Sequence, residues 1–243
     1  MLKEKTISSP LFRPYEQPMI KPLDFDSMVQ KLRGFFMPLG FKETFPQPRT
    51  SILAACEDPK TIRKYTFSGV EWPLIQTNQM WLEHDLMKEP ELGGVYCLST
   101  SYRDEPKPVE GRHNKIFPMF EAEHLGDYEH LLKTLSNLVV HLGFVKTTSD
   151  IKFFTYDELC ERYGVSILEA EHETKMWEEF GDVVAITHFP QRTSPFWNMK
   201  QIGFNKNTSD STRNHFVSRH YRKTQISRCA QNQCWYLFKR FGE

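Results

Sequence analysis

The sequence predicts a mixed α/β (α+β) domain in which helices flank an antiparallel central sheet. Two β-rich runs, residues 95–102 and 116–123, are separated by a loop that contains proline and glycine, and this order is typical of an antiparallel strand pair. Apolar residues at helical spacing lie before the pair, in residues 28–36, and after it, in residues 131–142. The length of 243 residues allows one sizeable domain around these elements.

Each element has its own signal along the chain. Residues 1–22 are rich in proline and are expected to form an extended arm. Asp24 or Asp26 is expected to cap the first helix, which Pro38 and Gly40 end. Residues 51–72 are expected to form a loop with a short helix, and Thr77 or Asn78 is expected to cap the helix that follows.

The elements after the strand pair are predicted in the same way. Asp127 is expected to cap a helix with an apolar stripe that Gly143 closes. A more polar helical region is expected over residues 156–163 and 167–180, and a strand over residues 183–189. His188 lies in this strand, where a hydrogen-bonded structural role is favoured over a role in a site.

Composition is typical of a soluble globular protein, with 39% hydrophobic and 26% charged residues. No apolar run reaches the length of a membrane span, and the first residues lack the apolar core of a signal peptide. The cysteines are five in number and scattered, which fits a reducing compartment. The sequence therefore predicts a cytoplasmic protein that does not contact membranes.

Formal charge is unevenly distributed. Residues 1–204 hold 23 Lys and Arg against 29 Asp and Glu, whereas residues 205–243 hold 8 against 2. The main body thus has no general basic field for nucleic acid, and any RNA contact would be local.

Charged side chains gather around the loop of the predicted strand pair. They are Arg103, Asp104 and Glu105 before it, and Arg112 and His113 after it. With Phe117 and Phe120 expected to form a floor, this end of the pair predicts a cradle for a polyanion that carries a flat ring.

The pattern YRDE, then a short loop, then RHxxxFxMFExE, resembles motif 2 of the class II aminoacyl-tRNA synthetases, in the aspartyl/asparaginyl branch. The resemblance implies that Arg103 is the catalytic residue, which holds the α-phosphate of ATP and the carboxylate of the amino acid. It implies that Glu105 binds the adenine amino group, that Phe117 stacks under the ring, and that Arg112 and His113 hold the outer phosphates. The implied cofactors are ATP and Mg²⁺, and the implied product is an aminoacyl-adenylate.

Two further segments extend the resemblance. The stretch PLGFKETFPQP resembles motif 1, which implies a homodimer, although Gln47 stands where the family usually has its proline. The stretch TNQMWLE resembles the substrate-binding segment, which implies that Gln79 holds the α-ammonium of the amino acid. Aspartyl enzymes have a lysine where this chain has Leu82, and asparaginyl enzymes have a glutamate where it has Glu83, so the pocket favours asparagine over aspartate.

The resemblance covers residues 20–200 and then ends. The magnesium-binding strand and motif 3 that the family implies are not recognisable beyond Gly203, so the domain of residues 23–204 is expected to be C-terminally incomplete. Residues 205–243 are expected to be a basic divergent tail, with disorder as one alternative. Three explanations stay open: a shifted-frame remnant of a longer gene, an RNA-binding basic peptide, and a zinc site at His215, His220, Cys229 and Cys234.

The predicted function is ATP-dependent activation of asparagine or aspartate, with tRNA as a further expected partner. Two alternatives stay open. One is a synthetase-derived asparagine synthetase, in which ammonia captures aspartyl-adenylate. The other is a catalytically dead paralogue that binds an amino acid or a protein partner.

Overall fold

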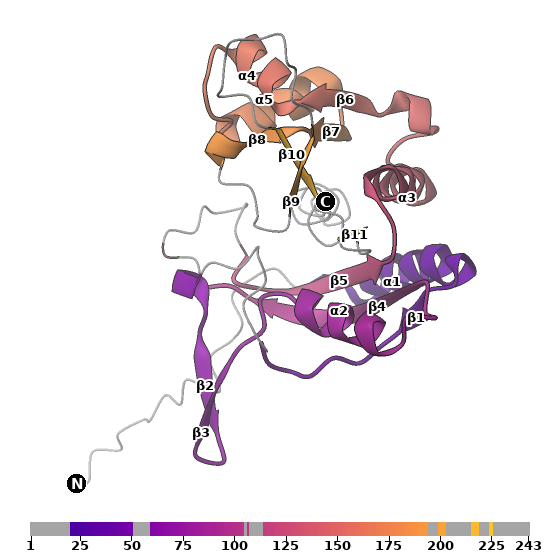
Figure 1. The fold of residues 1–243 in the computed structure, drawn as a ribbon, viewed down its shortest axis with the longest axis vertical. Helices are drawn as coiled ribbons and strands as arrows, with labels where there is room; N and C mark the ends of the chain where they lie inside the picture. The colour runs from indigo at the N-terminus through magenta and orange to yellow at the C-terminus, as the bar shows by residue number, and fades with distance from the viewer. Residues whose placement is uncertain are drawn as a thin grey trace, which may run out of the picture.

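The central sheet holds the fold together. A computed structural model describes residues 20–50, 59–104, 106, 114–193, 199–202, 215–218 and 224–225. The sheet has the strand order β1-β4-β5-β11 (Figure 1). Its strands are β1 (Lys42–Glu43), β4 (Gly94–Tyr102), β5 (Ile116–His124) and β11 (Thr224–Gln225). β4 and β5 are antiparallel over their whole length, which confirms the predicted strand pair to within one residue at each end.

Alternation along β4 separates two layers of packing. Tyr96 belongs to a core cluster with residues of the helices α1 (Pro22–Phe36) and α3 (Tyr128–His141). Val95 and Cys97 point to the other face and pack with buried leucines of the helix α2 (Gln79–Lys88). Successive side chains of a strand face opposite sides of a sheet, so α1 and α3 cover one face and α2 covers the other.

Helix α1 begins earlier than the sequence predicted. The expectation that Asp24 or Asp26 caps it was wrong, because Lys21 occupies the cap position and Pro22 is the first helical residue. Proline suits this position, since its fixed φ matches the helix and its missing N–H would have no partner there. Asp24 instead lies in the first turn, where a negative charge is favourable.

Helix α3 forms as predicted. The Asp127 side chain accepts a hydrogen bond from the backbone N–H of His130 at 2.9 Å. Gly143 follows the helix in a left-handed conformation with φ of 84°, which is the usual way for a helix to end. The apolar stripe of α3 lies in the core, as expected from its spacing.

A second hairpin follows the gap after residue 50. It consists of β2 (Lys64–Phe67) and β3 (Val70–Pro73) and projects from the sheet (Figure 1). The expectation of a loop with a short helix over residues 51–72 was wrong for residues 64–72. Ser68 and Gly69 both have positive φ, 51° and 75°, as a tight hairpin turn of type I′ requires.

Apart from β11, the elements after α3 form a further group above α3 in Figure 1, and Ile151 and Val183 join this group to the core cluster. Its helices α4 (Tyr156–Tyr163) and α5 (Ala170–Phe180) match the predicted helical regions. The predicted strand over residues 183–189 is interrupted at His188, whose φ is 55°. The strands are β6 (Lys152–Thr155), β7 (Val184–Thr187), β8 (Phe189–Pro190), β9 (Met199–Ile202) and β10 (His215–Ser218).

Two strands come from the basic tail. β10 lies between β8 and β9, and β11 pairs with the end of β5. The other residues of 205–243 lie outside the described part of the chain, among them His220, Cys229 and Cys234. The division into residues 1–22, 23–204 and 205–243 stays a prediction. Among the helices that the structure describes, none is both long and apolar enough to span a membrane.

Candidate active site

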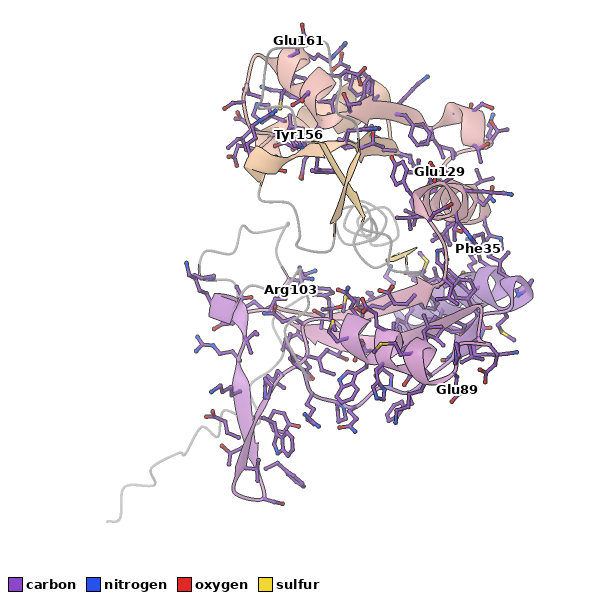
Figure 2. The ribbon with its side chains drawn as sticks, in the orientation of Figure 1. Phe35, Glu89, Arg103, Glu129, Tyr156 and Glu161 are labelled. Atoms are coloured by element: carbon purple, nitrogen blue, oxygen red, sulfur yellow. The ribbon has the colours of Figure 1, made fainter. Side chains whose placement is uncertain are left out.

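The candidate site lies at the loop end of the β4–β5 pair, beside the N-terminus of α2. Figure 2 labels Arg103 at this end of the sheet. Backbone hydrogen bonds fix the chain on both sides of the strand end. The N–H of Tyr102 donates to the carbonyl of Ile75 at 2.7 Å, and the N–H of Arg103 donates to the carbonyl of Lys115 at 2.7 Å. The position of Arg103 is therefore set by the rigid sheet rather than by the loop.

The Arg103 side chain lies over an aromatic ring and has an unused donor. Its guanidinium carbon is 5.5 Å from the centroid of the Phe117 ring, within the range of a cation–π contact. Its Nε atom is buried and makes no hydrogen bond to any described residue. Buried donors nearly always have partners, so this side chain is suited to an anionic ligand.

The two predicted floor residues lie on opposite faces of the sheet. Phe117 is half-buried on the side of Arg103. Phe120 packs into the core, with its ring stacked 5.1 Å from that of Tyr96 and 5.3 Å from that of Phe36. The expectation that Phe120 floors the site was therefore wrong, because residues an odd number apart on a strand face opposite sides.

The other predicted nucleotide-binding residues, Glu105, Arg112 and His113, lie outside the described residues. Asp104, the residue before Glu105, is described. Its carboxylate contacts the guanidinium of Arg63 and, at 3.3 Å, the ammonium of Lys115. The bond from Arg63 holds the pKa of Asp104 below its ordinary value. Arg63 immediately precedes β2 of the unpredicted hairpin, so its contact with this end of the sheet was not expected from the sequence.

The predicted substrate-binding pair is brought together on α2. Gln79 is the first residue of the helix and is buried, while Glu83 lies one turn later and is half-buried. The amide Nε2 of Gln79 donates to Oε1 of Glu83 at 2.9 Å. The spacing of four residues places both side chains on one face of the helix.

A buried carboxylate of the motif 2-like pattern, for which no role was predicted, anchors this helix end to the sheet. Glu121, on β5, is 1% exposed. It accepts from the hydroxyl of Thr77, from the backbone N–H of Asn78 at 2.8 Å and from the Asn78 side-chain nitrogen at 3.0 Å. The same Asn78 nitrogen donates to the Ser99 hydroxyl of β4 at 2.6 Å. The Asn78 side chain thus ties the start of α2 to both central strands, to β4 through Ser99 and to β5 through Glu121.

The ionisation of Glu121 is governed by two opposing effects. Burial raises the pKa of its carboxyl group, because the charged form loses its hydration. The donors from Thr77 and Asn78, and the positive charge of Arg103, act in the opposite direction. Arg103 therefore influences both the ligand side of the site and the buried anchor behind it. Glu121 is the first glutamate of the FExE part of the motif 2-like pattern, and its register places it on the face that α2 covers.

Two further candidates can be placed. The Nδ1 atom of His188 is 2.8 Å from the hydroxyl of Thr187, in agreement with a structural histidine. Within the part of the chain that the structure describes, no three His, Cys, Asp or Glu side chains converge as metal ligands. These residues alone do not form a Mg²⁺ site, so the function proposed below depends on no magnesium step.

Comparisons with known proteins were made for sequence and for structure. No protein-family model matches the chain. The chain is 34% identical over 123 residues to cytoplasmic asparagine–tRNA ligase of Homo sapiens, a match that covers 50% of this chain and 21% of that protein. It is 36% identical over 124 residues to the enzyme of Mus musculus, with the same coverage. The matched part of the chain thus spans about a fifth of the length of these relatives.

The fold is similar to solved asparaginyl-tRNA synthetases. The enzyme of Pyrococcus horikoshii, solved with asparaginyl-adenylate, matches with a TM-score of 0.62 and 19% identity, over 82% of this chain and 50% of that chain. The enzyme of Entamoeba histolytica, solved with the same adenylate, matches with a TM-score of 0.60 and 17% identity, over 90% of this chain and 58% of that chain. These matches confirm the predicted fold class.

Proposed function

Because the chain carries a class II synthetase-like catalytic domain of the asparaginyl/aspartyl type, we propose that it activates asparagine or aspartate with ATP to form an aminoacyl-adenylate. The observation that carries this proposal is the Arg103 side chain, which lies over Phe117 with a buried, unused Nε donor. A guanidinium offers a planar set of donors and keeps its charge, so it suits both a phosphate and a carboxylate.

The reaction that fits this arrangement needs no protein nucleophile. A carboxylate oxygen of the amino acid attacks the α-phosphorus of ATP, and the bond to the oxygen of pyrophosphate breaks. Arg103 orients the two reactants and stabilises the negative charge that grows on the phosphoryl oxygens. Phe117 provides an aromatic surface for the adenine ring once the guanidinium turns to the phosphate.

The remaining nucleotide contacts are part of the proposal. Glu105 would accept from the adenine amino group, and Arg112 and His113 would hold the outer phosphates. Magnesium would accompany ATP, bound through its phosphates. The proposed site therefore combines one arginine on the rigid sheet with charged residues of the adjoining loop.

Asparagine is the favoured substrate. Leu82 is fully buried against Val95 and Cys97, so no cation stands there to pair with the side-chain carboxylate of aspartate. The two solved synthetases described above were found with asparaginyl-adenylate. A homodimer through the segment that contains β1, transfer to tRNA and a cytoplasmic location complete the proposal.

ATP–pyrophosphate exchange tests the proposal. The full chain should catalyse exchange that depends on asparagine or aspartate, and Arg103→Ala should lower it about 100- to 1,000-fold, the usual cost of losing one group that stabilises the transition state. Arg162→Ala is a matched control, because the Arg162 guanidinium also lies over a phenylalanine ring, that of Phe180 at 5.0 Å, but on α4. This control should keep wild-type exchange.

Absence of exchange in the wild-type chain, with amino-acid binding seen by calorimetry, would refute the activity and leave a binding protein. If exchange is found, adding tRNA or ammonia identifies the acceptor. Formation of free asparagine from aspartate and ammonia would indicate an asparagine synthetase, and formation of aminoacyl-tRNA would indicate a tRNA ligase.

A further inference from the structure

The hairpin β2–β3 has two unlike faces. Residues directly opposite each other on paired strands, and residues two apart on one strand, point to the same face. The register of the two strands therefore places four apolar side chains on one face, Tyr65, Phe67, Val70 and Trp72. We call it the aromatic face. The opposite face is polar, and its Lys64 ammonium lies 2.6 Å from the Glu71 carboxylate.

The outer part of the aromatic face is open to solvent. The side chains that flank the turn are the most exposed, with Phe67 at 68% and Val70 at 49%, whereas Tyr65 and Trp72 are half-buried. Figure 1 shows the hairpin extending away from the central sheet. Apolar side chains that gather on one face of a projecting element are typical of a binding surface.

Arg49 adds a positive charge at the base of the aromatic face. Its guanidinium carbon lies 4.7 Å from the centroid of the Trp72 ring and 5.4 Å from that of Trp81. The indole N–H of Trp81 donates to the Arg49 carbonyl at 2.7 Å, and the Nε atom of Arg49 donates to the Gln47 side-chain oxygen at 3.1 Å. Among the described residues, no carboxylate forms an ion pair with this guanidinium. An oriented cation of this kind is suited to an anionic partner.

Flat rings beside a cation suit single-stranded RNA. Its unpaired bases stack on aromatic side chains, and its phosphates bind guanidinium groups. The phenol hydroxyl of Tyr65 can also exchange a hydrogen bond with the ribose 2′-hydroxyl, a group that DNA lacks. From this arrangement we propose that the aromatic face binds single-stranded RNA, with bases stacked on Phe67 and Tyr65 and one phosphate held by Arg49. The inference does not depend on the proposed function.

Fluorescence anisotropy of the full chain with a labelled oligouridylate tests the proposal. Phe67→Leu keeps an apolar side chain but removes the ring, so affinity should fall about 5- to 50-fold, the range for one base stacked on one ring. The dependence of this affinity on salt should stay the same. Arg49→Gln should instead reduce the slope of log K against log salt by about 0.7, the value for one phosphate of a single strand.

Two controls separate this surface from other ways of binding RNA. Phe153→Leu makes the same change at a phenylalanine of β6 that is 46% exposed, and it should leave the affinity unchanged. Duplex RNA hides its bases, so it should bind equally to Phe67→Leu and to the wild type. Binding through the eight cations of residues 205–243 would hold both RNA forms and would be insensitive to Phe67→Leu.

The sugar provides a separate test. Oligodeoxyuridylate should bind more weakly than oligouridylate, and Tyr65→Phe, which keeps the ring and loses the hydroxyl, should remove this difference. Equal binding of the two oligonucleotides to the wild type would overturn RNA as the occupant.

Other results would overturn the aromatic face as an RNA surface. One is an affinity of Phe67→Leu for oligouridylate equal to that of the wild type. Another is a dimer, seen by analytical ultracentrifugation, that dissociates in Phe67→Leu while RNA binding is unchanged, since the face would then join two copies of the chain. Circular dichroism of Phe67→Leu should match that of the wild type, because Phe67 is largely exposed, so a loss of affinity reports on the surface itself.

Discussion

Replacing Thr77 with valine tests the buried anchor of the site. Thr77 and Glu121 are 5% and 1% exposed, and valine has nearly the same shape as threonine, so the change leaves no cavity. It removes one donor to the carboxylate and one acceptor for the N–H of Gln79. A hydrogen bond to a charged group contributes about 1.5–3 kcal/mol, and one buried methyl group returns up to about 0.8 kcal/mol. We expect the free energy of unfolding to fall by about 2 kcal/mol.

The loss should depend on pH. Burial raises the pKa of the Glu121 carboxyl group above its ordinary value, so the folded chain binds the proton more readily than the unfolded chain. The contribution of this group to stability is therefore largest at low pH and is lost as the pH rises through the raised pKa. Removing a donor to the ionised form raises that pKa further, so the penalty of Thr77→Val should grow as the pH rises through the raised pKa.

Urea denaturation, monitored by circular dichroism, measures the difference in the free energy of unfolding between Thr77→Val and the wild-type chain. For a chain of this length, 2 kcal/mol corresponds to a fall in Tm of about 4–8 °C. Thr174→Val is the control, because its hydroxyl donates to a helix carbonyl on an exposed surface and its loss should cost less than about 0.5 kcal/mol. A loss for Thr77→Val that is no larger than that of the control would refute the role of Thr77 in anchoring Glu121.

Three further substitutions test the frame around the site. Gly94→Ala would place a Cβ 2.5 Å from the ring of Phe41, and we expect it to lose about 1–3 kcal/mol in urea denaturation, whereas Gly93→Ala, with nothing within 4 Å, should not. Asp127→Ala removes the cap of α3 and should cost about 1 kcal/mol, measured in the same way; an unchanged midpoint would contradict the cap. Burial lowers the pKa of His124, so stability is lost as the pH falls below about 6.5. In His124→Gln, the difference in Tm between pH 7.5 and 5.5 should be smaller than in the wild-type chain. A difference equal to that of the wild type would contradict a lowered pKa of His124.

The strand pair and the long helices could be predicted because their signals are local. Two β-rich runs on either side of a loop with proline and glycine mark β4 and β5, a period of 3.6 marks α3, and Asp127 and Gly143 mark its ends. The Gln79–Glu83 contact can be predicted from the sequence for the same reason, since residues four apart on a helix are neighbours. In each case the sequence separation alone determines which side chains meet.

Other features depend on partners that are distant in sequence. Glu121 reads as one more acidic residue near a strand end until α2 is placed over its face. The β2–β3 hairpin lacks the Asn-Gly or Asp-Gly pair that usually marks such a turn, and uses Ser68 and Gly69 instead. Phe120 is three residues from Phe117 on the same strand, so strand alternation turns it to the opposite face.

The two faces of β5 explain why the site and the core coexist on one short strand. Phe120 and Ala122 pack against the helices of one face, while Phe117 and Glu121 face the other side, where Arg103 and α2 lie. A shift of one residue in the register would turn each set of side chains to the opposite face. The core therefore fixes the register that brings Arg103 over Phe117, and mutations that loosen the core should weaken substrate binding before they unfold the chain.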